Sequence, residues 1–397
     1  MKHDGWEVKK LGEICETITK GTTPKTIGYD FTDSGINFIK VESINELGCF
    51  ITENFTHISN ECHKALMRSQ LEEYDMLFSI AGALGRTAIV DKSILPANTN
   101  QALSIIRLKE KNVRFLYYLQ YYLKSDRIKN YIDSIKVGVA QMNLSLGQLK
   151  EFPIIIPPLP EQFRIVEELD QLSNIIEKKR QQLSELDNLA QSIFYDMFDD
   201  IYENKYAFEI KELNEVFEFI KDGTHQTPQY VDEEEGVKFL SAKDVVKGFI
   251  DWNNIKYISD ELHLQLSKRV SPQRDDILLC KNGTYGICAL VETDDVFDIY
   301  VSLALMRPKK EYCPRFLVYA INNPITKEQF DKSIKGVGVP NLHLGEIKKA
   351  KIIIPPLHLQ QLFAQKIEAI EKEKELIKQS IKETEELFNS RMDYYFG

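Results

Sequence analysis

Cysteines, phosphate-binding glycine loops and long apolar runs are scarce or absent in this sequence. The six cysteines include no CxxC pair and no spacing with histidine that indicates a metal site. We therefore expect reduced thiols in a cytoplasmic protein, and no bound metal. No GxGxxG motif follows a predicted strand and no GxxxxGKS/T loop occurs, so the usual signatures of dinucleotide and ATP binding are missing. No run approaches the roughly 20 apolar residues of a membrane helix.

The Asn-Pro-Pro-Tyr/Phe tetrapeptide used by amino-methyltransferases is also missing. The seven histidines are scattered and form no HExxH motif. The sequence therefore predicts a chain that is not an enzyme by itself and that binds no cofactor of its own.

The charge is acidic overall but unevenly distributed. A net charge of −10 argues against a uniformly basic surface for nucleic acid. However, residues 160–200 alone contain 10 acidic and 4 basic residues. The rest of the chain is nearer to neutral and can gather lysines on one face. With 43% hydrophobic residues in 397, it can also form two or more domains with substantial cores.

One six-residue segment occurs twice and precedes a long helical pattern each time. Ile154-Ile-Ile-Pro-Pro-Leu159 recurs as Ile352-Ile-Ile-Pro-Pro-Leu357. Each isoleucine triplet predicts a strand that the two prolines end. The helix that follows has apolar residues at heptad spacing, interrupted by Lys179 in the first copy and by Lys374 and Thr384 in the second. The predicted seam consists of Ile165, Leu169, Leu172, Ile176, Leu183, Leu186, Phe363, Ile367, Ile370, Ile377 and Ile381.

Two helices of matching length and phase predict an intramolecular, antiparallel coiled coil, in which the buried lysines fix the register. Pairing with a helix of another chain is the alternative.

The segments between the helices are also duplicated. Trp6–Ile14 matches Phe208–Val216, and Lys20-Gly-Thr22 matches Asp222-Gly-Thr224. Turns and ends match better than the loops between them, which suggests one scaffold that carries two different surfaces. We expect mixed α/β domains, with boundaries at 1–159 for the first domain, 160–200 for a central helix, 201–356 for the second domain and 357–397 for a C-terminal helix.

The candidate recognition residues lie in matching loops of the two halves. Short hydroxyl and amide side chains beside glycine suit contacts with phosphates and base edges, and arginine suits guanine. Each residue taken singly also fits an ordinary turn or a solvated lysine, but their paired placement favours recognition. The candidates are Lys20, Gly21, Thr22, Thr23, Lys25, Lys40, Arg86, Lys136, Thr224, His225, Gln226, Lys243, Lys281, Asn282 and Tyr285.

Over its whole length the chain resembles the specificity subunit of type I restriction–modification systems. The resemblance rests on the Trp6-Glu-Val-Lys-Lys-Leu-Gly12 opening, the Lys20-Gly-Thr-Thr-Pro24 loop, the Ile156-Pro-Pro-Leu-Pro-Glu-Gln162 run and the alternation of domains and helices. The second half departs from this pattern, because His358-Leu-Gln360 and Asp222 replace the residues of the first half.

The resemblance implies two target recognition domains, each of which reads one half of a bipartite sequence in double-stranded DNA. It implies that the paired helices set the spacing and that the subunit docks two methyltransferase subunits. Two restriction/translocase subunits would complete the complex, and S-adenosylmethionine, ATP and Mg would be bound by these partners. A specificity subunit of another restriction–methyltransferase class and a coiled-coil scaffold that binds only protein are the alternatives.

Overall fold

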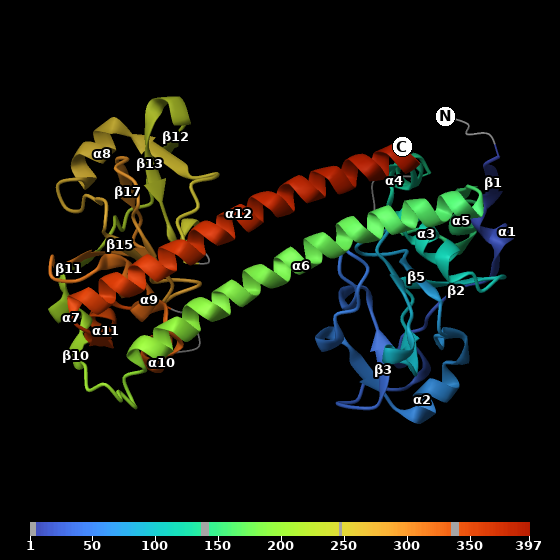
Figure 1. The fold of residues 1–397 in the computed structure, drawn as a ribbon, viewed down its shortest axis with the longest axis horizontal. Coiled ribbons are helices and arrows are strands. Elements are labelled where there is room, and N and C mark those ends of the chain that lie inside the picture. The colour runs from blue at the N-terminus through green and yellow to red at the C-terminus, as the bar shows by residue number, and fades with distance from the viewer. Residues whose placement is uncertain (1–4, 136–142, 246–247, 335–340) are drawn as a thin grey trace. The chain divides into compact units, whose positions relative to one another are not determined.

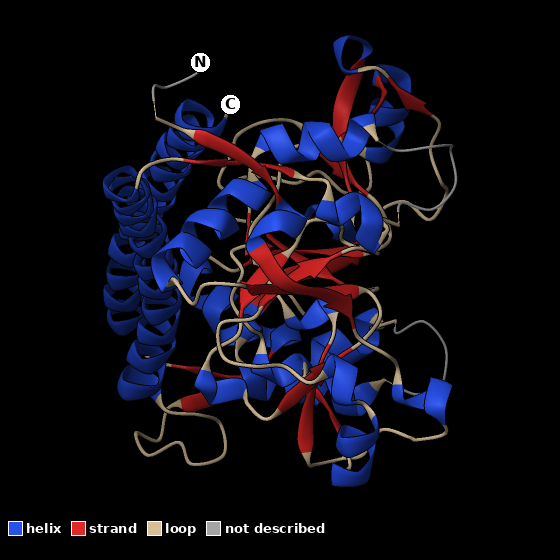
Figure 2. Ribbon diagram, turned by 90° about the vertical axis from the view of Figure 1, so that its right-hand side faces the viewer, coloured by secondary structure: helices blue, strands red, loops and turns tan. Residues whose placement is uncertain are grey.

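The computed structural model describes residues 5–135, 143–245, 248–334 and 341–397. The chain forms two compact units. Unit 1 comprises Met1–Arg180 with Lys378–Gly397, and unit 2 comprises Gln181–Ile377. Each unit therefore contains one globular domain and a section of both long helices (Figure 1). The predicted mixed α/β class is confirmed, with short strands and many connecting loops (Figure 2).

The globular domain of unit 1 is built on two small sheets. The first has the order β2-β8-β5-β6 and is antiparallel throughout, whereas the second, β4-β3-β7, contains the parallel pair β3–β7. Buried residues of helix α3 cover one side of the first sheet and join its core. The bounds are α1 Leu11–Ile14, β2 Cys15–Lys20, β3 Ile36–Ile39, β4 Thr56–Ile58, α2 Asn60–Ala65, β5 Met76–Ser79, β6 Thr87–Ile89, β7 Ala97–Thr99, β8 Leu103–Leu108, α3 Val113–Lys124, α4 Asp126–Ser134 and α5 Leu146–Lys150.

The globular domain of unit 2 repeats this plan. Its sheets have the orders β11-β18-β15-β16 and β12-β14-β13-β17, and β13–β17 is again parallel. The sequence repeat therefore corresponds to a repeated fold. The bounds are α7 Leu213–Val216, β11 Phe217–Asp222, β12 Tyr230–Val231, β13 Gly236–Leu240, β14 Lys256–Ser259, α8 Asp260–Leu266, β15 Ile277–Cys280, β16 Cys288–Leu290, β17 Phe297–Ile299, β18 Leu303–Pro308, α9 Pro314–Asn322, α10 Pro324–Ser333 and α11 Leu344–Lys349.

Each globular domain begins and ends in the same two-stranded sheet. Strand β1 (Glu7–Lys10) pairs antiparallel with β9 (Pro153–Ile156), and β10 (Glu209–Glu212) pairs in the same way with β19 (Lys351–Ile354). Both isoleucine triplets are thus strands, as predicted. The chain enters and leaves each domain at one place.

The two long helices begin directly after the proline pairs. Helix α6 spans Leu159–Phe198 and α12 spans Leu357–Phe396, with 40 residues each. The side-chain amide of Gln162 donates to the Pro157 carbonyl at 2.8 Å, and the side-chain amide of Gln360 donates to the Pro355 carbonyl at 2.8 Å. These bonds explain the glutamine in both motifs, because each one ties the first helical turn to the strand before it. No helix of the described ranges is long and apolar enough to cross a membrane.

The helices pair within each unit. In unit 1, Glu168 contacts Arg391 and Arg180 contacts Glu385. In unit 2, Asp187 contacts Lys374. Residue numbers rise along one helix as they fall along the other, so the pairing is antiparallel, as predicted. Every predicted seam residue is buried or half-buried, namely Ile165, Leu169, Leu172, Ile176, Leu183, Leu186, Phe363, Ile367, Ile370, Ile377 and Ile381.

Candidate nucleic-acid interface

Both candidate loops start at a glycine that no other residue can replace without a backbone shift. A Cβ atom on Gly21 would lie 1.9 Å from the Thr99 carbonyl oxygen, and one on Gly223 would lie 1.9 Å from that of Ile299. The next amide in each loop donates to the same carbonyl, at 3.2 Å in the first domain and 3.1 Å in the second. The scaffold therefore starts the two loops at equivalent positions, after which the first forms a 3-10 helix at Pro24–Ile27 and the second leads to strand β12.

In the first domain, the loop presents cations next to hydroxyl groups. Lys20 and Lys25 are exposed, and no ion pair of theirs occurs among the described residues. Thr22 and Thr23 are half-buried, and the Thr23 hydroxyl donates to the side chain of Gln101. Free ammonium groups beside an anchored backbone suit contacts with phosphate.

Two other cations of the first domain are partly used inside it. Lys40 lies over the ring of Phe31 at 4.7 Å. The guanidinium of Arg86 donates to the Ile44 carbonyl at 3.1 Å, and this bond supports the turn that contains Ile44. The sequence suggested Arg86 as a residue that suits guanine, but at least one of its donors is directed to the backbone here. Lys136 lies outside the described residues.

In the second domain, the predicted residues fall into exposed and internally bonded groups. His225, Gln226 and Lys243 are exposed, and Thr224 is half-buried. Asn282 is half-buried as well and forms a backbone bridge with Asn341. The hydroxyl of Tyr285 donates to Asp331 at 2.7 Å, and the Lys327 ammonium lies 3.6 Å from the centre of its ring. Tyr285 is thus bonded within the domain.

A buried carboxylate organises the charges around the second loop. Asp222, the last residue of β11, is only 7% exposed. Its Oδ1 accepts from Nη2 of Arg269 at 2.8 Å. Its Oδ2 lies 3.1 Å from Nζ of Lys281 and 3.2 Å from Nε2 of His225. We call these four residues the Asp222 cluster.

The pKa of Asp222 reflects this arrangement. Burial raises the pKa of its carboxyl, but the hydrogen bond from Lys281 and the charges around it outweigh burial, so that the pKa lies below its ordinary value. Asp222 therefore stays ionised at neutral pH. Lys281 is itself only 6% exposed. A direct contact of Lys281 with DNA, as the sequence predicted, would require its removal from a buried ion pair, which is costly.

Sequence reasoning missed Arg269. It lies 47 positions from Asp222 along the chain and follows α8, outside both glycine loops. The one available signal was the change from Lys20 to Asp222 between the two halves, because a carboxylate at that place calls for cationic partners.

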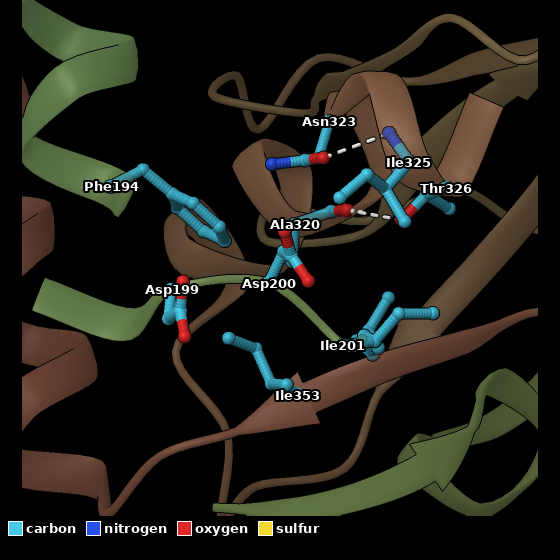
Figure 3. A pocket seen from close by; sticks show the side chains of 10 residues that line it. Phe194, Asp199, Asp200, Ile201, Ala320, Asn323, Ile325, Thr326 and Ile353 are labelled. Atoms are coloured by element: carbon cyan, nitrogen blue, oxygen red, sulfur yellow. Dashed lines mark hydrogen bonds between the residues drawn. The ribbon is translucent and has the colours of Figure 1, made fainter. Parts of the chain in front are cut away.

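One small pocket lies within unit 2. A pocket between the end of α6, α9, α10 and β19 has space of about 20 Å³ for water and is lined by Phe194, Asn323 and Ile353, among others (Figure 3). That volume holds one or two water molecules. The described residues contain no group of three or more His, Cys, Asp or Glu that could hold a metal ion.

Comparisons with known proteins agree on one family. Residues 3–188 and 206–386 both match the type I restriction modification DNA specificity domain. The putative type I restriction enzyme MjaX specificity subunit of Methanocaldococcus jannaschii is 26% identical, with 97% of this chain and 90% of that protein covered. The type I restriction enzyme EcoBI specificity subunit of Escherichia coli is 22% identical, with 93% and 80% covered.

Two solved structures share the fold. One is a chain from a structure of complex assembly and conformational transition of the type I R-M system, with a TM-score of 0.60, 18% identity and coverage of 99% of this chain and 98% of that chain. The other is the type I restriction–modification system S subunit from M. genitalium, with a TM-score of 0.55, 14% identity and coverage of 99% and 96%.

Proposed function

The chain belongs to the type I restriction–modification DNA specificity family, and we propose that it reads a bipartite DNA sequence, one half with each globular domain. The observation that carries this proposal is the duplication. The family matches both halves, and the residue before the loop glycine is the exposed Lys20 in one domain and the buried Asp222 in the other. One scaffold with two different surfaces suits a target with two different half-sites.

The long helices set the spacing between the half-sites. Each has 40 residues, which corresponds to about 60 Å at 1.5 Å per residue. Ion pairs and polar seam residues fix the register of the pair within each unit. A pair with fixed register and length acts as a ruler, and a change in its length changes the spacing.

The family recognises DNA and is not catalytic, so partner subunits carry out the chemistry. We infer two methyltransferase subunits, which bind S-adenosylmethionine, and two restriction/translocase subunits, which use ATP and Mg. Exposed leucines recur at matching helix positions, Leu159 with Leu357 and Leu189 with Leu387. Equivalent apolar positions in the two halves fit two copies of one partner.

The DNA contacts come from the loops at Gly21 and Gly223. In the first domain, Lys20 and Lys25 hold phosphates and the hydroxyl groups of Thr22 and Thr23 face the bases. In the second, the exposed side chains after Gly223 take the same place. The near-neutral domains meet the DNA while the acidic helices serve protein contacts.

Mapping of adenine methylation in host DNA tests this function. The map is made with the gene intact, deleted and restored. We expect the deletion to remove one motif of two short blocks split by unspecified bases, and restoration to return it. An unchanged methylome while the chain and its partner subunits are present would contradict the proposal and favour a scaffold that binds only protein.

A further inference from the structure

The Asp222 cluster lies at the start of the second recognition loop and joins buried charges to exposed ones. Asp222 and Lys281 are 7% and 6% exposed, whereas the side chains of Arg269 and His225 are 56% and 64% exposed. We propose that Arg269 and His225 read a base pair of the second half-site, and that Asp222, held by Lys281, positions them. This inference rests on the proposed function and names the residues that determine one half of its specificity.

The buried part of the cluster is rigid. The backbone amide of Gly223, next to Asp222, bonds to the Leu303 carbonyl at 3.4 Å. The amide of Lys281 donates to the Ser302 carbonyl at 2.8 Å, and its own carbonyl accepts from Leu342 at 2.8 Å. Both side chains therefore project from fixed strand ends. A recognition group is precise when a second residue with a fixed position holds it.

The exposed part has the chemistry to read a base. Among the described residues, Arg269 uses only Nη2 of its guanidinium in a side-chain bond, to Asp222. The remaining donors form the fork that matches O6 and N7 of guanine in the major groove. When Nε2 of His225 donates to Asp222, Nδ1 remains an acceptor for the amino group of the cytosine paired with that guanine. One carboxylate beside a lysine and an arginine also leaves net positive charge, which attracts DNA.

The first domain shows that the fold does not need this cluster. The backbone bonds of Lys281 recur at Ile80, whose amide donates to Ala102 at 2.8 Å and whose carbonyl accepts from Leu144 at 2.8 Å. Ile80 thus takes the place of Lys281, and Lys20 takes the place of Asp222. In the first domain the apolar side chain of Ile80 fills this buried position, so the scaffold avoids the desolvation cost of a buried ion pair. A cluster that the fold does not require points to recognition.

The test compares methylation motifs. The chain is expressed with its partner subunits in a strain that lacks the system, as wild type, as Arg269→Lys, and as the double variant Asp222→Asn with Lys281→Met. The double variant removes both buried charges together, so neither is left unpaired in the core. Arg274→Lys is the matched control, because Arg274 pairs with the exposed Asp294 at 2.8 Å in the same domain.

We expect Arg269→Lys to keep the first half-site and the spacing while one base pair of the second half-site loses about 5- to 150-fold of its preference. We expect the double variant to lose its sequence preference at the same base pair, and the Arg274→Lys control to keep the wild-type motif. The intact first half-site shows that each variant complex is folded and active. Lysine keeps the charge but not the fork, so it separates base reading from phosphate contact.

A wild-type second half-site in the Arg269→Lys variant, with or without slower methylation, would overturn the inference and leave Arg269 as a phosphate contact or a structural ion pair. Relaxation of both half-sites together would also overturn it. If the wild-type complex itself produced no bipartite motif, the proposed function would fail, and the inference with it.

Discussion

The ammonium group of Lys179 on α6 lies 3.2 Å from the hydroxyl of Thr384 on α12. These residues interrupt the apolar seam of their helices, and the structure brings the two interruptions together. The Ser380 hydroxyl accepts a further hydrogen bond from the same ammonium. A satisfied polar layer stabilises one register over the apolar alternatives, at a cost in total stability.

Replacing both Lys179 and Thr384 by leucine should therefore make unit 1 more stable and its helix register less defined. We expect a gain of about 1 kcal/mol or more, seen in calorimetry as a rise in Tm of roughly 2–4 °C. Methylation maps of the variant complex should show a broader distribution of half-site spacings. Lys179→Ala, which leaves Thr384 without this partner, serves as the control and should lower Tm. A lower Tm in the double leucine variant would refute this account of the layer.

Shortening the helix pair by one heptad should shorten the spacer in the DNA target. Residues 174–180 and 381–387 lie opposite each other at the Arg180–Glu385 contact, where Nη2 and Oε1 are 2.6 Å apart, so both segments are deleted. The loss is about 10 Å of helix, or about three base pairs. Methylation mapping should give the two original half-sites with a shorter gap. A spacer of unchanged length between the half-sites would contradict the proposal that the helices set the spacing.

Replacing Thr22, Thr23 and Lys25 by alanine should alter or relax the first half-site only. These residues lie beside the fixed backbone at Gly21, so the change removes side chains without moving the scaffold. The same methylation map reads both half-sites at once. Alanine at Thr224, Gln226 and Thr227 is the reciprocal control and should act on the second half-site. A first-loop variant that changed only the second half-site would reverse the assignment of the domains.

The two domains should differ in how their stability depends on pH, because a histidine contacts an asparagine in the first domain and an aspartate at the matching place in the second. His63 contacts Asn98 in the first domain, and Nδ1 of His263 lies 2.7 Å from Oδ2 of Asp298 in the second. Burial raises the pKa of the Asp298 carboxyl above its ordinary 3.8, and His263 opposes this only in part. Because the pKa of Asp298 is raised in the folded state, its contribution to the free energy of unfolding is complete below pH 3.8. This contribution is lost as the pH rises through the folded-state pKa of Asp298.

Asp298→Asn should remove the loss of stability that ionisation of the buried Asp298 carboxyl causes. We expect the Tm of the variant to exceed that of the wild type by a margin that grows between pH 4 and pH 7, measured by thermal unfolding at each pH. Asn98→Asp in the first domain is the converse variant and should introduce the same loss there. A margin that shrinks with rising pH would mean that the ionised Asp298–His263 pair stabilises the fold.

Local patterns predicted the helices and the strand ends well. Both proline pairs end a strand and start a helix, and the ends of α6 and α12 lie within two residues of the predicted boundaries. Helical periodicity and the geometry of proline act within a few residues, so a sequence records them directly. The seam rests on the same periodicity, and its residues are buried or half-buried, while their assignment to contacts between the two helices stays a prediction.

Side-chain partners far apart in sequence were not predictable in this way. Lys281 stands in a Lys-Asn-Gly turn and looks solvated, yet it is buried against Asp222, 59 positions away. Arg86 follows a glycine turn and looks free, yet it bonds to the Ile44 carbonyl, 42 positions away. Tertiary packing decides these contacts, and no local pattern encodes which strand end will meet which loop.

The pairing of β1 with β9, and of β10 with β19, has a consequence for inheritance. Since each domain starts and finishes in one two-stranded sheet, a recombination event needs compatible DNA only at two short junctions to exchange a whole reading surface. The helices and their register are left untouched by such an exchange. Under the proposed function, one such exchange gives a new methylation pattern in a single step, with the partner subunits unchanged.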